Sequence, residues 1–235
     1  MTICIAAACR EEDESRIVIC MDSRLDDVYT SSDKAVKLDT LGHNWFTLIS
    51  GDWIPATELS KFLSVRVHHA PCPAFREDIF NLVKQSTGDF QSSPFCEANC
   101  RIELIVGGFV FGEPMLMYTG YEGGTPYTRL ASEVAVIGSG LSIAMPILRI
   151  RKYSASISVR RAIYLVYEAK RYSENAPSVG PKTAIAILYP NGNARSLGRP
   201  YYRKLEDSRQ RFGLQPINLE ALPDPQFPID GLSLQ

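Results

Sequence analysis

The order of strand-like and helix-like segments constrains this chain more than any other feature of its sequence. Two short apolar runs, at residues 3–9 and 16–22, are joined by the charged stretch REEDES and predict a β-hairpin. Two further strand candidates, KAVKLD and WFTLIS, follow before helical spacing begins near Pro55. Four strands therefore precede any helix, and we assign them to a first sheet.

The remaining segments repeat this order. Two amphipathic helical patterns, around residues 59–66 and 75–83, are followed by the strand candidates RIELIVGGF, PMLMYTGYE and EVAVIG, which we assign to a second sheet. Two more helical patterns come next, and TAIAILY and ARSLG close the series as strands. A parallel fold would alternate single strands with single helices, so this order favours two mainly antiparallel sheets packed together, with helices outside.

Composition limits the function classes that this fold could serve. The 235 residues are 45% hydrophobic and 22% charged, which suits one domain with a sizeable core and an appendage. The net charge of −1 offers no general attraction for nucleic acid, and no apolar run approaches the roughly 20 residues of a membrane helix. Six cysteines without an export signal are typical of reduced thiols, so we expect a cytoplasmic protein that has no disulfide framework and binds neither nucleic acid nor membrane.

The C-terminal stretch differs from the rest of the chain. Beyond residue 198 a short helical pattern gives way to a segment in which prolines recur too often for regular structure. We therefore divide the chain into a domain, residues 1–198, and a C-terminal arm, residues 199–235. The arm carries more apolar side chains than a solvated tail should, which predicts that it packs on a neighbouring subunit.

Seven stretches, taken in order, resemble the proteasome β-subunit family and its bacterial relatives, the two-ring peptidase of the heat-shock ATP-dependent protease and the ancestral β-subunit-like proteins. The resemblance extends from Thr2 to about Leu197. The stretches are the strand that Thr2 begins, CMDSR, KAVKLD, LISG, IELIVGGFVFGEPMLMYTGYEGG, VIGSGLSIA and SVGPKTAIAIL. The resemblance implies an α+β fold, the four-layer αββα sandwich of N-terminal nucleophile hydrolases.

The resemblance also implies a threonine nucleophile. Removal of Met1 would leave Thr2 with a free α-amine, whose ordinary pKa of roughly 7.7 to 8.0 suits a base for the weakly nucleophilic hydroxyl. Lys37 matches the family's catalytic lysine, and Asp22 matches the acid that holds this lysine by a charge-assisted hydrogen bond. Gly51 matches the glycine whose backbone N–H stabilises the negative charge on the attacked carbonyl.

Further positions match the family, and one departs from it. Ser139 and Ser178 match the serines that surround the nucleophile, whereas Asn175 stands where the family usually has an aspartate. An asparagine carries no charge, which leaves open whether this change tunes the activity or marks its loss. Lys34 is a second candidate for the lysine role, and we favour Lys37.

We expect an N-terminal threonine hydrolase, most simply a threonine-type peptidase that works in a homo-oligomeric ring and cleaves polypeptides or peptides. The resemblance places Leu25, Ile49 and Trp53 in the pocket beside the nucleophile, which suggests a weak apolar preference. The chain has no phosphate-binding glycine motif, so any ATPase or unfoldase would be a separate partner. Two alternatives stay open: a non-catalytic ring subunit that binds partners, and a small-molecule amidohydrolase.

Metal binding is not expected from the sequence, and we predict no cofactor. His68, His69 and Cys72 offer three ligand types within five residues, but adjacent histidines at a helix end rarely converge on one ion. The stretch CEANC resembles one half of a zinc site, and no second half follows it. Taken alone, a threonine after the initiator methionine is common, so the hypothesis depends on all the motifs occurring together.

Overall fold

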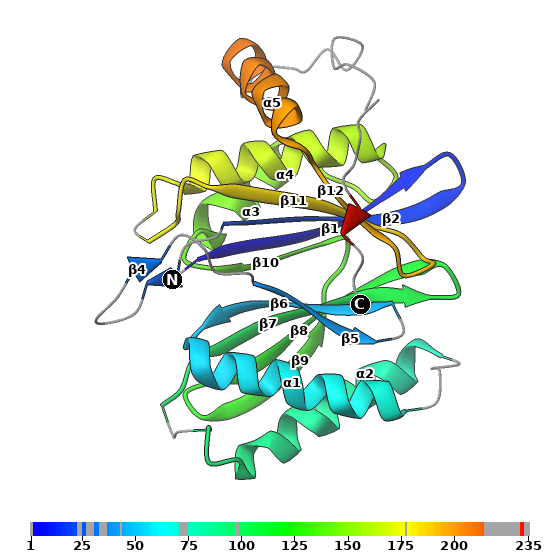
Figure 1. The fold of residues 1–235 in the computed structure, drawn as a ribbon, viewed down its shortest axis with the longest axis vertical. Helices are drawn as coiled ribbons and strands as arrows, with labels where there is room; N and C mark the ends of the chain where they lie inside the picture. The colour runs from blue at the N-terminus through cyan, green and yellow to red at the C-terminus, as the bar shows by residue number, and fades with distance from the viewer. Residues whose placement is uncertain are drawn as a thin grey trace.

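Two antiparallel sheets stacked between two layers of helices form the fold of the computed structural model (Figure 1). The structure describes residues 2–22, 37–42, 44–70, 75–96, 99–176 and 178–213, together with the backbone of residues 25–26, 31–32 and 231–232. The predicted four-layer αββα sandwich is confirmed.

The first sheet has six strands, and the N-terminal strand is second from one edge. Every pairing between its strands is antiparallel. In spatial order the strands are β10 (Val134–Gly138), β1 (Ile3–Glu11), β2 (Glu14–Asp22), β11 (Thr183–Leu188), β12 (Ala194–Ser196) and β13 (Gly231–Leu232).

The second sheet has five antiparallel strands in sequence order. Short turns join neighbouring strands except the second and third, whose connection carries two helices. A separate two-stranded hairpin links the first sheet to this one along the chain. The five strands are β5 (Leu38–Gly42), β6 (Trp45–Gly51), β7 (Ile102–Val110), β8 (Glu113–Glu122) and β9 (Thr125–Leu130), and the hairpin consists of β3 (Leu25–Asp26) and β4 (Ser31–Ser32).

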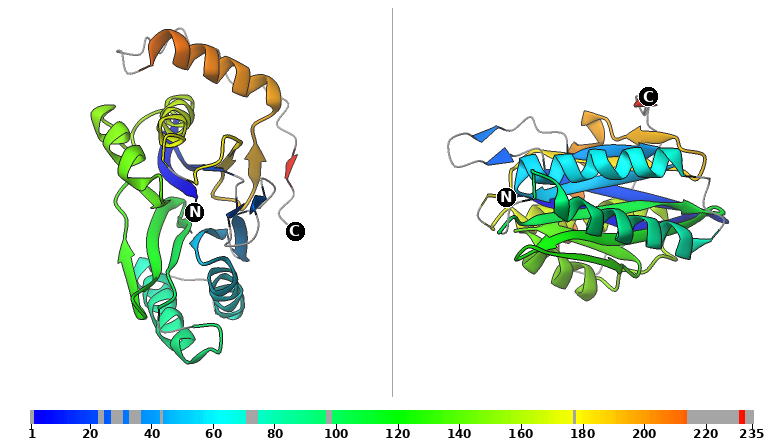
Figure 2. Two further views of the ribbon diagram at one scale, coloured as in Figure 1. Left: turned by 90° about the vertical axis from the view of Figure 1, so that its left-hand side faces the viewer. Right: turned by 90° about the horizontal axis from the view of Figure 1, so that it is seen from below.

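The helices form the outer layers (Figure 2). On the first sheet lie α3 (Leu141–Ile150) and α4 (Val159–Ser173), and α5 (Arg199–Phe212) lies outside α4. On the second sheet lie α1 (Trp53–His69) and α2 (Arg76–Asp89), which a short 3₁₀ turn at Phe90–Ser92 follows. None of the described helices is long and apolar enough to cross a membrane.

The assignment of strands to sheets from the sequence was wrong for three segments. The structure pairs β5 and β6 with β7 in the second sheet, and β10, from EVAVIG, with β1 in the first. Hydrophobic periodicity identifies a strand and its buried face. The sequence of a strand that is buried on both faces does not indicate which strand it pairs with. Strand β6 is such a case, because every residue from Trp45 to Ser50 is buried.

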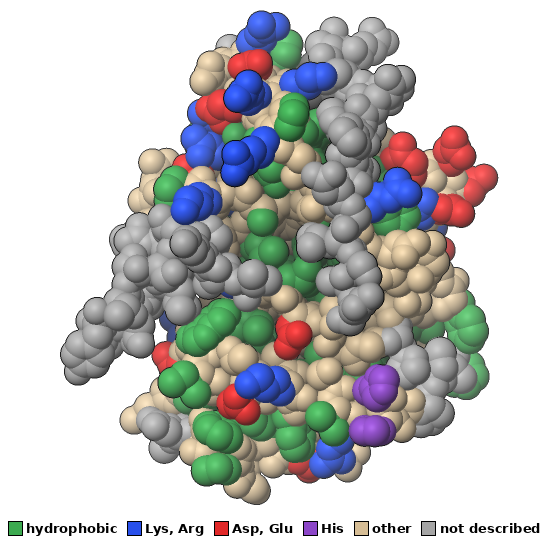
Figure 3. All heavy atoms as spheres, in the orientation of Figure 1, with side chains coloured by type: hydrophobic (Ala, Val, Ile, Leu, Met, Phe, Trp, Pro, Cys, Tyr) green, Lys and Arg blue, Asp and Glu red, His purple; other side chains and the backbone are tan. Residues whose placement is uncertain are grey.

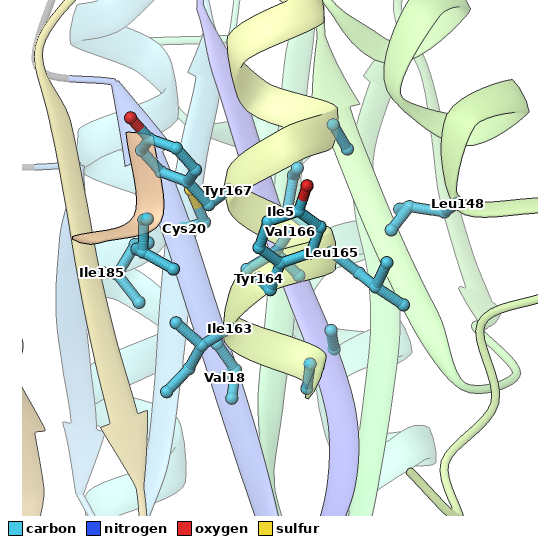
Figure 4. Close-up of a cluster of buried hydrophobic side chains, with 14 of the residues drawn as sticks. Ile5, Val18, Cys20, Leu148, Ile163, Tyr164, Leu165, Val166, Tyr167 and Ile185 are labelled. Carbon is cyan, nitrogen blue, oxygen red and sulfur yellow. The ribbon is translucent and has the colours of Figure 1, made fainter. Parts of the chain in front are cut away.

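Strand pleating gives the molecule three stacked cores. Along β1, Ile3 and Ile5 point toward α3 and α4, whereas Cys4 and Ala6 point toward the second sheet. Figure 4 shows the first of these cores, where side chains of α4 such as Ile163 lie over the strands. Because both faces of β1 are packed, its N-terminal end is held firmly in the middle of the sandwich.

Helix α5 packs on its own chain. Tyr201 and Leu205 are buried in the same hydrophobic core as α4, and the Tyr202 hydroxyl accepts a hydrogen bond from the backbone N–H of Ile185 at 2.8 Å. Its other face is rich in Lys and Arg side chains (Figure 3). Residues 214–230 and 233–235 of the predicted arm lie outside the described residues, so the boundary at residue 198 and the contact with a neighbouring subunit remain predictions.

A carboxylate network fastens α5 to α4 and predicts an acid-sensitive contact. Glu206 accepts hydrogen bonds from the Tyr167 hydroxyl at 2.8 Å and from Arg209, and the Arg209 bonds lower the pKa of Glu206 from 4.5 to about 2. Because the folded-state pKa is depressed, this stabilisation is present above pH 4.5 and is lost as the pH falls toward 2.

We predict that wild-type protein loses about 1 kcal/mol more stability between pH 5 and 2 than a Glu206→Gln variant does, since a partly exposed ion pair contributes little more than this. Urea unfolding across that pH range measures the difference. Glu77→Gln, an exposed glutamate on α2, is the matched control and should follow the wild type. Parallel curves for wild type and Glu206→Gln would contradict the prediction.

Candidate functional site

Thr2 lies at the entrance to β1 and is almost completely buried, with 3% of its surface exposed. Its backbone carbonyl accepts hydrogen bonds from the Ser139 hydroxyl at 3.4 Å and from the Gly140 N–H at 3.5 Å. Gly138, the end of β10, has a φ of 94°, and a Cβ there would lie 2.1 Å from the same carbonyl oxygen. Only glycine fits here, because the position combines a left-handed backbone with this close approach.

Asp22 ends β2 beside the Thr2 side chain and is fully buried. Its Oδ1 accepts hydrogen bonds from the Thr2 hydroxyl and from the backbone N–H of Ile3 at 3.0 Å. Its Oδ2 accepts a bond from the backbone N–H of Gly180 at 2.8 Å. A buried carboxylate is stable only with such a set of donors, so Asp22 fixes the relative positions of these segments.

Lys37 completes the cluster from the segment that leads into β5. Its Nζ lies 2.7 Å from Asp22 Oδ1 and also donates a hydrogen bond to Thr2 Oγ1, and the residue is 1% exposed. Its backbone carbonyl accepts a bond from Ile49 N at 3.0 Å, which fixes the segment against β6. The structure thus brings Thr2, Asp22 and Lys37 together, and their chemical roles remain a prediction.

The electrostatics of this cluster suit a nucleophilic hydroxyl. An ammonium group and a carboxylate flank Thr2 Oγ1 in a site shielded from water, where charges interact far more strongly than in solvent. The arrangement can hold the hydroxyl in one orientation and stabilise negative charge that develops on its oxygen.

Gly51 ends β6 with a φ of 95°, and a Cβ there would lie 2.2 Å from the carbonyl oxygen of Arg101. Asp52, the next residue, makes two hydrogen bonds with Arg101: its N–H donates to the Arg101 carbonyl, and its Oδ2 accepts from the Arg101 N–H, both at 2.8 Å. Ser50 Oγ would lie 3.1 Å from a Cβ on Gly138. The end of β6 therefore lies beside the Gly138 segment that holds Thr2.

The other predicted site residues, Ser139, Ser178 and Asn175, differ in whether they contact Thr2. Ser139 contacts the Thr2 carbonyl, as described above. Ser178 is half-buried, with a φ of 68°, two residues before the Gly180 N–H that binds Asp22. Asn175 is exposed, and its Nδ2 donates to the Tyr172 carbonyl at 3.0 Å, so this amide satisfies a backbone carbonyl in the last turn of α4.

The predicted pocket residues are described only in part. Ile49 is buried in β6, and Trp53 is half-buried at the start of α1. Leu25 belongs to the short strand β3, whose side chains lie outside the description, as does all of Lys34. The choice of Lys37 over Lys34 therefore rests on the contacts of Lys37.

Lys170 is a neighbour of the site that sequence reasoning missed. This fully buried residue of α4 donates hydrogen bonds to Glu174 and, at 3.0 Å, to the carbonyl of Pro181, next to Gly180. Burial lowers its pKa, although Glu174 opposes the shift. It therefore anchors the loop whose N–H binds Asp22. The sequence did offer an indication of this role: Lys170 lies on the same helical face as Ile163 and Val166, where the pattern requires an apolar residue.

Cys4 is the second missed neighbour, and its environment argues against a thiolate nucleophile. Its Sγ donates to the Ile49 carbonyl at 3.6 Å, and burial raises its pKa to about 12. A thiol with so high a pKa stays protonated at neutral pH and reacts poorly.

Within the described part of the chain, no group of three or more His, Cys, Asp or Glu side chains is arranged to hold a metal ion. Of the sequence candidates for a metal ligand, Cys72 lies outside that part.

Comparison with solved structures shows a proteasome-like fold. A mutant of Anbu from Hyphomicrobium sp. strain MC1 superposes with a TM-score of 0.69 and 16% identity, covering 90% of this chain and 94% of its own. Anbu, the ancestral beta-subunit, from Yersinia bercovieri superposes with a TM-score of 0.69 and 17% identity, covering 89% and 94%. At such identities the likeness establishes the fold alone.

The comparisons correct the family assignment that the motifs suggested. No family model matches the chain, and no curated protein matches it either. Short motifs placed in order on a common fold are therefore insufficient to assign this chain to the proteasome β-subunit family. What the chain shares with proteasome-like proteins is the sandwich.

We predict that Gly138→Ala destabilises the protein by more than about 3 kcal/mol, because a left-handed alanine is strained and its Cβ collides with the Thr2 carbonyl. Gly112→Ala is the matched control: its φ of 81° is similar, and nothing lies within 4 Å of a Cβ there, so it should cost about 1 kcal/mol. Denaturant unfolding of the two variants measures both values. Equal losses would show that the approach to Thr2 is not tight.

Proposed function

We propose that this chain is an N-terminal threonine hydrolase that cleaves amide bonds once Met1 has been removed. The observation that carries the proposal is the contact of Thr2 Oγ1 with both Lys37 Nζ and Asp22 Oδ1 in a buried site. A threonine that only packed in a core would not require a buried ion pair around its hydroxyl, since burying two charges is costly.

The proposed reaction uses these groups in turn. The free α-amine of Thr2 accepts the hydroxyl proton, and Oγ1 attacks the substrate carbonyl carbon to give a tetrahedral oxyanion. The Gly51 N–H and the Lys37 ammonium stabilise the charges that develop, and Asp22 keeps Lys37 in place. The amine then returns the proton to the leaving nitrogen, which leaves an ester on Thr2 that water hydrolyses.

A peptide or polypeptide is the substrate that we propose, within a homo-oligomeric ring. Two solved structures with the same fold are of proteins named as ancestral beta-subunits or their mutants, and the apolar C-terminal arm offers surface for a neighbouring copy. Closed rings of identical subunits require such head-to-tail contacts. A cytoplasmic location is part of the same proposal.

A non-catalytic ring subunit is the second candidate, and one observation favours it. The Asn175 amide is exposed and donates to the Tyr172 carbonyl at the end of α4. The position where the proteasome β-subunit family usually has an aspartate therefore offers no anion to the Thr2 amine. Such a subunit would use the same fold for assembly alone.

We predict that Thr2→Ala abolishes peptide hydrolysis and labelling by threonine-directed boronates, because no other group replaces its hydroxyl. Thr2→Ser should keep part of both, since serine supplies the same hydroxyl and amine. Turnover of a fluorogenic peptide and intact-mass analysis measure activity, labelling and the loss of Met1 in one series. Thr125→Ala, in the edge strand β9, is the control and should behave as wild type.

Undiminished hydrolysis by Thr2→Ala would end the threonine mechanism. Retention of Met1 in all of the protein, with no labelling, would favour the non-catalytic subunit.

We predict a large homo-oligomer that truncation after Gly213 weakens, because the truncated residues carry apolar side chains that a solvated tail would not need. Truncation there leaves α5 in place, so the contacts of Tyr201 and Leu205 with the core are preserved. Mass photometry at micromolar concentration measures both proteins. A monomeric intact chain would exclude the enclosed ring, whereas unchanged oligomers after truncation would exclude only the role of the arm.

A further inference from the structure

Two cysteine thiols lie in contact in the loop that leads into β7. The Sγ atoms of Cys96 and Cys100 are 3.8 Å apart; Cys96 is half-buried and Cys100 is buried. A disulfide requires an Sγ–Sγ distance of about 2.05 Å, so the two sulfurs need to approach by about 1.8 Å. Cys96 gives solvent access to the pair, which a fully buried pair would lack.

The other described cysteines are placed quite differently. Cys4, Cys9 and Cys20 are buried within β1 and β2, and burial raises the pKa of each. Among the five cysteines that the structure describes, Cys96 and Cys100 alone form a thiol–thiol contact.

The dithiol is joined directly to the backbone of the candidate site. Cys100 precedes Arg101, whose carbonyl and N–H are the two groups held by Asp52 at 2.8 Å. The same carbonyl packs against Gly51, where a Cβ would lie only 2.2 Å away. Burial chiefly, and the nearby Cys96 and Asp52 in addition, raise the pKa of the Cys100 thiol to about 11.

We propose that Cys96 and Cys100 form a reversible dithiol–disulfide site, oxidised by low-molecular-weight disulfides such as oxidised glutathione, that controls the position of Arg101 and thereby of Gly51. The site stands on its own geometry, and only its effect on turnover rests on the proposed hydrolase function.

The exchange balances without a further reactant. The half-buried Cys96 thiolate attacks the small disulfide, forms a mixed disulfide and releases one small thiolate. The raised pKa of Cys100 keeps its thiolate fraction small, but its target lies only 3.8 Å away within the same chain. Cys100 loses its proton to solvent and attacks Cys96 Sγ, which closes the protein disulfide and releases the second small thiolate. The protein loses two hydrogens and two electrons, and the small disulfide is reduced to two thiols.

Closure of the Cys96–Cys100 disulfide should change the candidate site through the backbone of Arg101. Drawing Cys100 Sγ toward Cys96 pulls on the adjoining Arg101 backbone, and a displacement there strains its two hydrogen bonds to Asp52. Gly51 cannot keep its contact with the Arg101 carbonyl if that peptide moves. We expect a loss of at least about tenfold in kcat/KM in the oxidised protein, since one misplaced oxyanion donor costs on the order of 100-fold or more.

Tryptic mapping tests the site directly, because the fragment from Gln85 to Arg101 contains both cysteines and no other. After the full chain is incubated with excess oxidised glutathione, this fragment should be about 2 Da lighter, and dithiothreitol should restore its mass. Cys96→Ser and Cys100→Ser should each prevent the internal bond, whereas Cys72→Ser should react as wild type does. A fragment that stays reduced or carries only glutathione would overturn the proposal.

Hydrogen exchange at the Asp52 amide, which donates to the Arg101 carbonyl, tests the link to Gly51 without reference to activity. Oxidation should speed this exchange at least about fivefold in the wild type and leave it unchanged in Cys96→Ser. Unchanged exchange in a protein with the closed disulfide would overturn the link. Faster exchange in a protein that hydrolyses nothing in either redox state would uphold the site and reject the hydrolase function.

Discussion

The buried carboxylate of Asp22 is the interaction on which the rest of the site depends. It accepts hydrogen bonds from Thr2, Lys37 and two backbone N–H groups, which come from the beginning of β1, the segment before β5 and the loop before β11. Removing one partner of a buried ion pair costs about 3–5 kcal/mol, because the remaining charge stays desolvated. The two sheets are therefore joined at this end by an ion pair as well as by apolar packing. Lys170 stabilises the Gly180 loop by a hydrogen bond to the Pro181 carbonyl.

Much of the fold was predictable because its signals are local. The hairpin of β1 and β2 and the pairs of helices follow from alternation and helical spacing within single segments. Sheet membership was not predictable in this way: β10 pairs with β1 across more than a hundred residues, although its sequence resembles that of its neighbours along the chain. Such a pairing is decided by the packing of the whole sandwich, which no single segment encodes.

The candidate site shows the same division between local and distant information. Thr2, Asp22 and Lys37 were predictable as a set from their motifs, and the structure places them in contact. The contribution of Lys170 and the position of the Asn175 amide depend on how α4 ends against the Gly180 loop. The role of Arg101 was not predictable, because its backbone, and not its side chain, bonds to Asp52 and packs against Gly51.

The contacts of β1 with later parts of the chain also determine when the candidate site can form during synthesis. Thr2 is among the first residues made, yet its carbonyl is bound by Ser139 and Gly140, and its acid partner by Gly180. Contacts so distant in sequence form slowly and only after the later segment is available. The contacts of Thr2 and Asp22 therefore stay incomplete in a nascent chain until some 180 residues have been added, so the order of synthesis delays the assembly of the candidate site.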